Sequence, residues 1–257
     1  MIHYIGNFVD PENTELYSYN VPGMKKMEYV IAKLRQTGES ITVLSLCRGR
    51  KRGFHATKYK KIDDNLLHLQ YRASCVGGKI GSVFDLLLYK LQLYYYVFTK
   101  VKPEDTVMIY HSVRSTHTLA KIKKIKKANW ILEVEEIYGY GAVYDNPKVG
   151  SEIADIKNFE KFIFVNNVLP EMLGVSENYT VCYGAYLPLT IQKQNDDGIV
   201  RVVYAGTIEN SKVGAYTAVN AAQYLPANYE MHIAGFGSEE SIKKIKSMIE
   251  ANNAEYD

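Results

Sequence analysis

Val202-Val203-Tyr204-Ala205-Gly206-Thr207 is the first of two apolar runs that decide the fold, and Met231-His232-Ile233-Ala234-Gly235-Phe236-Gly237 is the second. Each run ends in small residues, and a helix-compatible stretch beginning near Lys212-Val213-Gly214 lies between them. This order predicts a strand, a helix and a parallel strand. Ligands of open α/β sheets bind outside the carboxyl ends of the strands, where glycine lets a phosphate approach the backbone closely. The segment therefore predicts a site for a phosphate-bearing ligand.

The composition is that of an ordinary globular protein, with 257 residues of which 47% are hydrophobic. Such a chain can bury one large core or two modest ones. Cys47, Cys75 and Cys182 are widely spaced, which argues against a disulfide framework and a zinc site, so we expect no metal and a reducing, cytoplasmic compartment. The chain shows no signal peptide and no uncharged apolar stretch of membrane-spanning length.

Strand-like and helical patterns alternate along the whole chain, which predicts α/β lobes with parallel sheets. We expect a first lobe at 1–186, a polar linker at 187–199 and a second lobe at 200–257. Residues 1–186 carry 25 Lys and Arg against 19 Asp and Glu, whereas residues 187–257 carry 6 against 9. This asymmetry suggests two lobes that face different partners, although solvated surface charge explains it equally well.

Individual elements follow from the periodicity of apolar residues. Strands are expected at 2–9, 41–46, 66–71, 106–110, 130–134, 162–165, 180–183, 200–204 and 229–234, and helices at 24–36, 82–101, 115–127, 151–161, 168–174, 213–224 and 238–251. The helix at 82–101 is apolar nearly all round, so it should pack on more than one side. The second lobe holds fewer elements than a compact lobe needs, and we expect it to be partial and the chain to be an inactive fragment.

These elements and motifs resemble the retaining GT-B glycosyltransferases of the group-1 (GT4) family. The resemblance covers the first lobe and the opening of the second, and it implies two Rossmann-like lobes, of which the second mainly holds the sugar nucleotide. The implied reaction moves a hexose from a nucleotide sugar to a bacterial polysaccharide or lipid-linked glycan, with no further cofactor.

The resemblance assigns the donor diphosphate to Gly206, Thr207, Lys212, Gly235 and Gly237. Lys212 would stabilise the charge that grows as the sugar–phosphate bond breaks. Thr207 stands where the family usually has arginine, and the family's Glu-x7-Glu segment would lie beyond the last residue. The plain alternatives are a surface lysine at Lys212 and simple strand-to-helix turns at the glycines.

In the first lobe, Pro22, Gly23 and Lys25 resemble the family's acceptor-side glycine loop, and His111 sits where the family often has a histidine. The family's active-site histidine commonly follows the strand that here ends at Glu135 and Glu136, so acidic residues take its place. The sequence alone leaves open whether His111 is catalytic or a core histidine with both nitrogens satisfied.

Glu133, Glu135 and Glu136 form a carboxylate run at the end of an apolar strand. Strand alternation places Glu133 and Glu135 on one face and Glu136 on the other. A carboxylate at this edge could position an acceptor hydroxyl, accept its proton or bind a divalent cation. A solvated charged turn is the alternative. We expect Glu135, Glu136 and His111 to be the catalytic residues.

Residues 121–127 are strongly basic, and Ile122 and Ile125 are spaced to share one helix face. This pattern suits a surface helix that contacts anionic lipid headgroups at the inner face of the cell membrane, or a solvated helix. Nucleic acid is not expected, because no nucleic-acid-binding motif accompanies the basic run.

Three other functions compete with the transferase. The chain could be a non-catalytic sugar-nucleotide-binding or scaffold subunit that a second chain completes. It could also be a GT-B-like epimerase or another sugar-nucleotide enzyme. A nicotinamide dehydrogenase is disfavoured, because no Gly-x-Gly-x-x-Gly follows the first strand.

Overall fold

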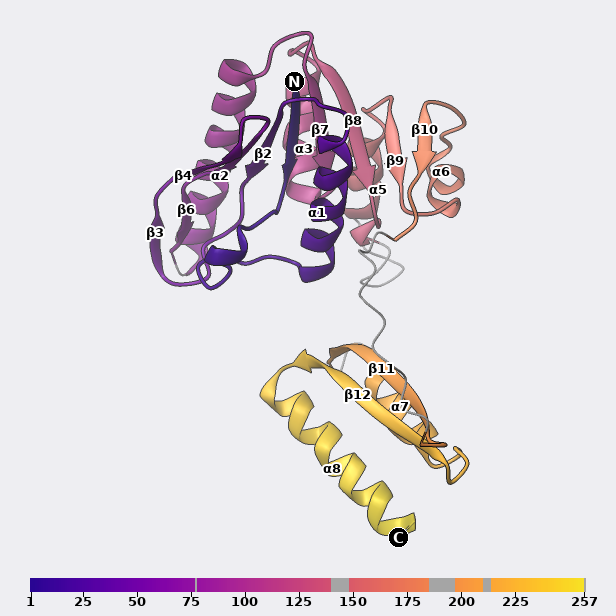
Figure 1. Ribbon diagram of the computed structural model, residues 1–257. Helices are drawn as coiled ribbons and strands as arrows, with labels where there is room; N and C mark the ends of the chain where they lie inside the picture. Colours follow the sequence, from indigo (N-terminus) through magenta and orange to yellow (C-terminus); the bar gives the residue numbers. More distant parts are fainter. Residues whose placement is uncertain (77, 140–147, 185–196, 210–213, 257) are drawn as a thin grey trace. The chain divides into compact units, whose positions relative to one another are not determined.

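The computed structural model describes residues 1–76, 78–139, 148–184, 197–209 and 214–256. The chain divides into two compact units, Met1–Pro188 and Leu189–Asp257 (Figure 1). The linker predicted at 187–199 lies mostly outside the described residues and stays a prediction. None of the helices among the described residues is long and apolar enough to cross a membrane.

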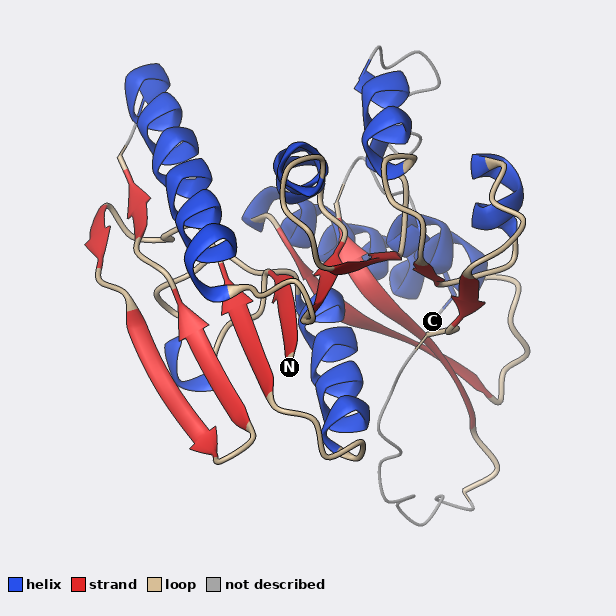
Figure 2. Cartoon of the chain, turned by 90° about the horizontal axis from the view of Figure 1, so that it is seen from above, coloured by secondary structure: helices blue, strands red, loops and turns tan. Residues whose placement is uncertain are grey.

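An eight-stranded sheet forms the centre of the first unit (Figure 2). Its strand order is β10-β9-β8-β7-β1-β2-β5-β4, and every neighbouring pair is parallel except β4 with β5. The strands are β1 (Ile2–Gly6), β2 (Ile41–Ser45), β4 (Lys58–Asp63), β5 (Leu66–Gln70), β7 (Thr106–Tyr110), β8 (Asn129–Val134), β9 (Phe162–Phe164) and β10 (Tyr179–Val181). The strands β3 (Gly53–His55) and β6 (Ala73–Cys75) form a separate antiparallel pair.

Helices cover both faces of this sheet. The helix α1 (Val21–Arg35) packs on one face, where Tyr4 and Met108 meet Met27 and Ile31. The other face packs against α2 (Gly78–Lys100), α3 (Val113–Lys123), α5 (Lys148–Ile156) and α6 (Val168–Leu173). Because parallel strands need crossover helices, this layering follows directly from the alternating pattern of the sequence.

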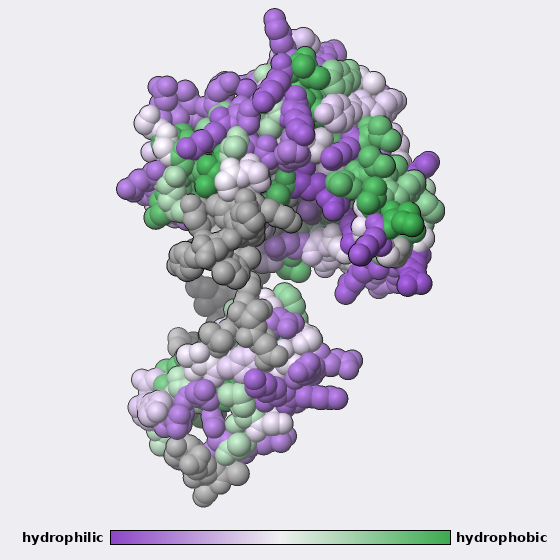
Figure 3. Space-filling view, turned by 180° about the vertical axis from the view of Figure 1, so that it is seen from behind, coloured by the Kyte–Doolittle hydropathy of each residue, from purple (hydrophilic) through white to green (hydrophobic). Residues whose placement is uncertain are grey.

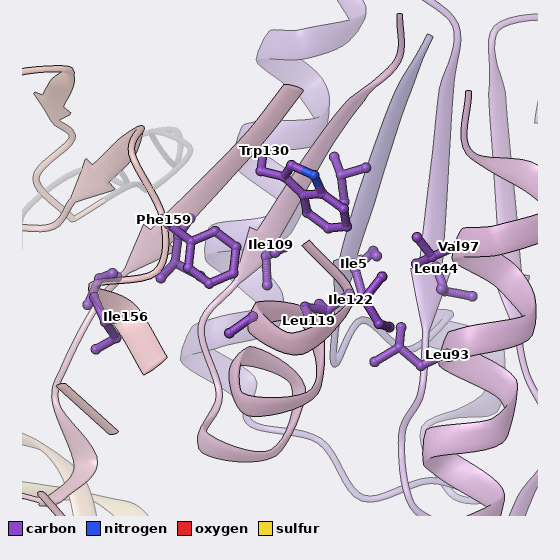
Figure 4. Close-up of a cluster of buried hydrophobic side chains, with 14 of the residues drawn as sticks. Ile5, Leu44, Leu93, Val97, Ile109, Leu119, Ile122, Trp130, Ile156 and Phe159 are labelled. Carbon is purple, nitrogen blue, oxygen red and sulfur yellow. The ribbon is translucent and has the colours of Figure 1, made fainter. Parts of the chain in front are cut away.

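The larger core lies between the sheet and the second set of helices (Figure 4). Leu93 of α2 and Leu119 of α3 are both fully buried there, next to Ile5 and Ile109 of the central strands. Each such side chain contributes about 1.5–3 kcal/mol on burial. Trp130, the single tryptophan, lies in the same core and reports on the folding of this unit.

The second unit is a smaller parallel pair, β11 (Val200–Ile208) and β12 (Tyr229–Gly237), with the helices α7 (Gly214–Ala222) and α8 (Glu239–Tyr256). Its core contains Ile208, Ala215, Val219 and Ile245. The predicted strand–helix–strand–helix order of this unit is confirmed.

The helices expected at 115–127 and 82–101 differ from the structure in the way they pack. The helix expected at 115–127 ends at Lys123, so Ile122 is fully buried whereas Ile125 is 70% exposed, and the two do not share a face. The helix expected at 82–101 does not pack on two sides. One face of α2 packs on the core and the opposite face, which carries Leu87 and Leu91, is exposed. Hydrophobicity on both faces of a helix does not by itself bury both faces.

Candidate functional site

Two carboxyl groups meet at the carboxyl end of β8, on the face of the sheet that α1 covers. Glu133 is fully buried, and its Oε2 accepts a short hydrogen bond from the hydroxyl of Tyr4 on β1. Glu135 follows one residue after the strand ends, and its side chain remains 20% exposed. As strand alternation predicts, Glu133 and Glu135 interact with each other, and Glu136 is exposed.

These two glutamates can share one proton. Burial raises the pKa of Glu133 to about 7, against the hydrogen bond from Tyr4, and the charge of Glu135 raises it further. Burial also raises the pKa of Glu135, against the opposing effect of Lys26. One oxygen on each group, Glu133 Oε1 and Glu135 Oε1, is buried without a hydrogen-bond partner. A proton between the two carboxyl groups gives both oxygens a partner and removes one buried charge.

Lys26 of α1 supplies the positive charge of this cluster. Its side chain is buried, with Nζ 3.4 Å from Glu135 Oε1 and 2.9 Å from the backbone oxygen of Cys182, to which it donates a hydrogen bond. With one shared proton, the pair of glutamates carries a single negative charge that Lys26 balances. The cluster is therefore close to neutral, as a buried group of ionisable side chains must be.

Tyr110 packs the first turn of α1 against the glutamates. Burial raises its pKa, and the charges of Glu135 and Glu133 raise it further, so the phenol stays protonated and able to donate. A Cβ added to Gly23 would lie only 3.0 Å from the hydroxyl of Tyr110. Glycine at this position lets the start of α1 approach the carboxylate cluster.

Pro22 and Gly23 form the first turn of α1, not the loop that we expected before a helix at 24–36. Asn20 caps this turn by accepting a hydrogen bond from the backbone N–H of Gly23. Lys25, the lysine named from the sequence, is exposed and pairs with Glu28 at 2.8 Å. Its neighbour Lys26 is the one that reaches Glu135.

His111 lies beyond β7 and is buried with both ring nitrogens occupied. Nδ1 is 2.7 Å from the hydroxyl of Thr116, and Nε2 is 2.8 Å from Oε1 of Glu152. Glu152 also accepts hydrogen bonds from the backbone N–H groups of Tyr138 and Gly139, at 2.9 Å each. Burial favours a raised pKa at Glu152, but these hydrogen bonds outweigh it and lower that pKa.

This arrangement gives His111 a positioning role. The His111–Glu152 pair fixes the backbone that follows Glu136, while the backbone N–H of His111 donates to the backbone carbonyl oxygen of Glu133 at 2.9 Å. A histidine with both nitrogens engaged and 2% exposure has no nitrogen free to take a proton from a substrate.

A polar hollow of about 430 Å³ opens farther along the same sheet edge, by β4 and β5. Its charges balance, because Lys58 and Lys60 stand against Asp10 and Glu12 in the lining. Lys60 Nζ lies 2.7 Å from Asp10 and 3.0 Å from Glu12. Burial lowers the pKa of His68 to about 4, so this ring is neutral. The hollow suits an uncharged, hydroxyl-bearing ligand, and its walls are Asp10, Glu12, Asn13, Tyr17, Lys58, Tyr59, Lys60, His68 and Gln70.

The predicted donor residues of the second unit lie differently from expectation. β11 continues to Ile208 and β12 to Gly237, so Gly206, Thr207, Gly235 and Gly237 lie inside paired strands instead of after them. A Cβ at Gly235 would lie 1.9 Å from the backbone oxygen of Gly206. Close strand pairing thus already requires glycine there. Lys212 lies outside the described residues.

A second hollow, of about 850 Å³, lies in this unit beside the first half of β12, against α7 and α8. Its lining includes Tyr229 and Ile233 but not Gly235 or Gly237. The predicted diphosphate residues and this hollow are therefore at different places on β12.

Sequence reasoning missed the partners that complete the carboxylate cluster and the histidine site. Lys26 has the pattern of an ordinary surface lysine, Tyr4 that of a core aromatic, and Glu152 that of a polar helix residue. A hint did exist, because Lys26 falls among the apolar positions Met24, Met27 and Val30 of one helix face. Among the described residues, no group of three or more His, Cys, Asp or Glu side chains has the geometry of a metal site.

Comparisons with known proteins identify the fold. No protein-family model matches the sequence, and no curated protein matches it. Solved structures do match over nearly the whole chain. Trehalose-6-phosphate synthase from E. coli, bound with UDP-2-fluoro glucose, superposes with a TM-score of 0.64 at 9% identity, covering 98% of this chain and 68% of that one.

Two further solved structures superpose on this chain in a similar way. Sucrose-phosphate synthase from Thermosynechococcus elongatus has a TM-score of 0.62 at 10% identity and covers 98% of this chain and 67% of its own. The Gap123 glycosylation-associated complex from Streptococcus agalactiae has a TM-score of 0.54 at 8% identity and covers 100% and 76%. At such low identity the likeness shows the fold alone. The predicted α/β, GT-B-like fold class is confirmed.

Proposed function

We propose that this protein is a glycosyltransferase that moves a hexose from a nucleotide sugar to a hydroxyl group of a glycan acceptor. The observation that carries the proposal is the buried Glu133–Glu135 pair at the carboxyl edge of a GT-B-type sheet, the edge at which α/β folds bind ligands. A carboxyl group whose pKa lies near neutrality both holds and releases a proton at physiological pH.

Glu135 is the residue that faces the acceptor in this proposal, because it is the partly exposed member of the pair. Two neighbours adjust the pKa of Glu135. Glu133 shares a proton with it, and the ammonium of Lys26 lies 3.4 Å from its carboxylate. Glu135 accepts the proton of the acceptor hydroxyl as that oxygen bonds to the sugar and the sugar–phosphate bond breaks, so that the nucleoside diphosphate leaves. Glu136 is an alternative base, because it is exposed one residue along the chain. His111 holds the segment in place.

The hollow beside β5 is proposed to take a sugar unit of the acceptor. Gln70 and Tyr17 stand in its wall, and Gln70 Oε1 and the hydroxyl of Tyr17 are buried without a hydrogen-bond partner. Tyr59 is 67% exposed beside them and offers an aromatic face to a sugar ring. The bound donor analogue of the E. coli synthase supports a nucleotide sugar as donor.

The finer assignments rest on the family resemblance alone. They are a retaining outcome, membership of the group-1 (GT4) family, and a bacterial polysaccharide or lipid-linked acceptor. Membrane contact through the basic segment 121–127 rests instead on its lysines, because its two isoleucines do not share a helix face. On the donor side, Lys212 and the backbone of Gly206, Thr207, Gly235 and Gly237 are proposed to contact the diphosphate. Only binding measurements on this unit can test that set, because Lys212 is not among the described residues.

A panel of nucleotide sugars with glycan acceptors tests the transferase proposal. Acceptor-dependent release of a nucleoside diphosphate supports the transferase and contradicts the prediction of an inactive fragment. Glu135→Gln should then lower kcat by about 100-fold or more with nucleotide-sugar affinity unchanged. Glu160→Gln, which changes an exposed carboxylate paired with Lys123, is the matched control and should retain full activity. If Glu136→Gln loses activity and Glu135→Gln remains fully active, then Glu136 is the base and Glu135 is not.

A second function is a non-catalytic subunit of a glycosylation complex, favoured by the likeness to the Gap123 complex. It predicts that the chain binds a partner chain and shows no transfer activity alone. Activity of the purified chain that is sensitive to Glu135→Gln rejects it.

A further inference from the structure

The outward face of α2 carries a continuous row of exposed apolar side chains. Ile80 is 88% exposed and Leu91 is 67% exposed, and the other members of the row are Val83, Phe84, Leu87, Tyr95 and Phe98. At about 100° per residue, all seven fall within about one third of the helix circumference. The buried residues of the same helix, among them Tyr89, Leu93 and Tyr96, lie on the opposite side.

This apolar row is long and extends beyond the helix. With 23 residues, α2 is about 35 Å long. Phe54 of β3 is 64% exposed and meets Phe84 edge to face at a ring separation of 5.9 Å, which widens the row near the start of the helix. Figure 3 shows apolar residues gathered on the side of the first unit where α2 lies. Exposed apolar areas of this extent mark interaction surfaces in soluble proteins.

Positive charges lie along one side of the row and near its two ends. The charged residues of α2 are Lys79, Lys90, Lys100 and Asp85, and the only acid among them is buried. At the end of the helix, the Lys126 ammonium lies 5.9 Å from the ring of Phe98. Arg50, Lys51 and Arg52, just before β3, are exposed as well. The surface thus combines an apolar strip with a basic border.

We propose that the outward face of α2 binds the surface of an anionic lipid bilayer. A helix that is apolar on one side and bordered by lysine and arginine lies in the membrane interface, with its apolar side chains among the acyl chains and its cations on the headgroups. Because no described helix can cross a membrane, this contact is peripheral. A second copy of the chain is a poorer occupant, because it would bring the same lysines face to face.

This inference is independent of the transferase proposal, because it rests on α2 and not on the carboxylate cluster. It also moves the membrane contact away from the expected site. Of the two isoleucines predicted to face lipid, Ile122 is fully buried in the core. Lys126, beside Phe98, is the member of the basic segment that adjoins the α2 row.

Flotation of the full chain with lipid vesicles tests the proposal. We expect binding to phosphatidylglycerol-containing vesicles that weakens with salt, and at least about tenfold less binding to pure phosphatidylcholine vesicles. The double variant Leu87→Gln/Leu91→Gln should lower partitioning by about 100-fold. Lys79→Glu/Lys90→Glu should lower it by about tenfold or more on anionic vesicles only.

The matched control is Tyr224→Gln in the second unit, which replaces an apolar side chain that is 82% exposed but lies outside the row. It should bind like the parent chain. Unchanged urea midpoints, followed by Trp130 fluorescence, show that the α2 variants still fold. Absence of vesicle binding by the parent chain overturns the proposal. So does a concentration-dependent dimer without vesicle binding that Leu87→Gln/Leu91→Gln abolishes, because the face is then a contact between copies.

Discussion

At the carboxyl end of β8 the first unit places Glu133 and Glu135, whereas at the carboxyl end of β12 the second unit places Gly235 and Gly237. Both edges are where an α/β sheet binds ligands. At the first, ionisable side chains from β8, β1 and α1 gather in a buried cluster. At the second, the absence of side chains lets two strands pair at a distance that leaves no room for a Cβ.

The comparison shows that two short motifs at equivalent sheet edges can be present for different reasons, one for strand pairing and the other not. Strand pairing explains the glycines without any ligand, because Gly237 would collide with the backbone oxygen of Ile208 if it carried a Cβ. No comparable structural requirement explains a fully buried Glu133 beside a mostly buried Glu135, because carboxyl groups taken out of water cost folding free energy unless a charge or a proton compensates them. The carboxylate edge is therefore the stronger candidate for chemistry.

The largest expected effect comes from removing the one cation of the carboxylate edge. Lys26→Met leaves Glu135 without its partner at 3.4 Å, and we expect a loss of about 4 kcal/mol in the free energy of unfolding. Urea titration followed by Trp130 fluorescence measures it. Lys33→Met, seven residues later on α1, is the control and should cost less than about 1 kcal/mol. Adding Glu135→Gln to Lys26→Met should restore most of the loss, and no restoration would show that Lys26 acts only by packing.

The next effect is a pH dependence carried by Glu133. Its pKa is about 7 in the folded chain and near the ordinary value of 4.5 when unfolded, so the folded state holds the extra proton between these values. The contribution of Glu133 to the free energy of unfolding is therefore fully present below about pH 4.5. As the pH rises through 7, that free energy decreases by about 3 kcal/mol.

Comparing parent and Glu133→Gln at pH 5 and pH 8 isolates this contribution. Carboxyl groups with lowered pKa values, such as Glu152 and Asp105, act in the opposite direction but are present in both chains. The parent should lose more stability than the variant between the two pH values. Equal losses would mean that Glu133 is already ionised in the folded protein at pH 5.

Most of the fold was predictable from local pattern. The strand at 106–110 coincides with β7, and the other predicted strands differ from the observed ones by a few residues, because short apolar runs bounded by polar residues are local signals. The packing of α2 was not predictable, since apolar character on both faces of a helix does not say how many neighbours cover it. Exposure of Leu87 and Leu91 is a property of the whole unit.

The candidate site was only half predictable. The carboxylate run and its alternation follow from residues that are adjacent in sequence. Their partners do not, because Tyr4 lies 129 residues from Glu133, and Lys26 reaches the cluster only through the packing of α1 on the sheet. The choice between Lys25 and Lys26 depends on which face of α1 meets the core, and the apolar neighbours Met27 and Val30 decide it.

The smallest of the three effects concerns the glycine edge. In Gly235→Ala the new Cβ would lie 1.9 Å from the oxygen of Gly206, so β11 and β12 must move apart. We expect the second unit to lose about 2 kcal/mol, because forced displacement in a packed region typically costs 1–3 kcal/mol. Hydrogen exchange of the β12 amides measures this, and Trp130 in the first unit should not respond.

Ala234→Ser is the control, because residue 234 is exposed on the opposite face of the same strand. If Gly235→Ala leaves hydrogen exchange unchanged yet weakens nucleotide-sugar binding, the glycine serves a ligand and not the strand pair. The second unit would then resemble the first, because the residues at its sheet edge would serve ligand binding. If exchange accelerates and binding by the remaining folded protein is unaffected, the glycine edge is structural, and the donor contacts fall to residues such as Lys212.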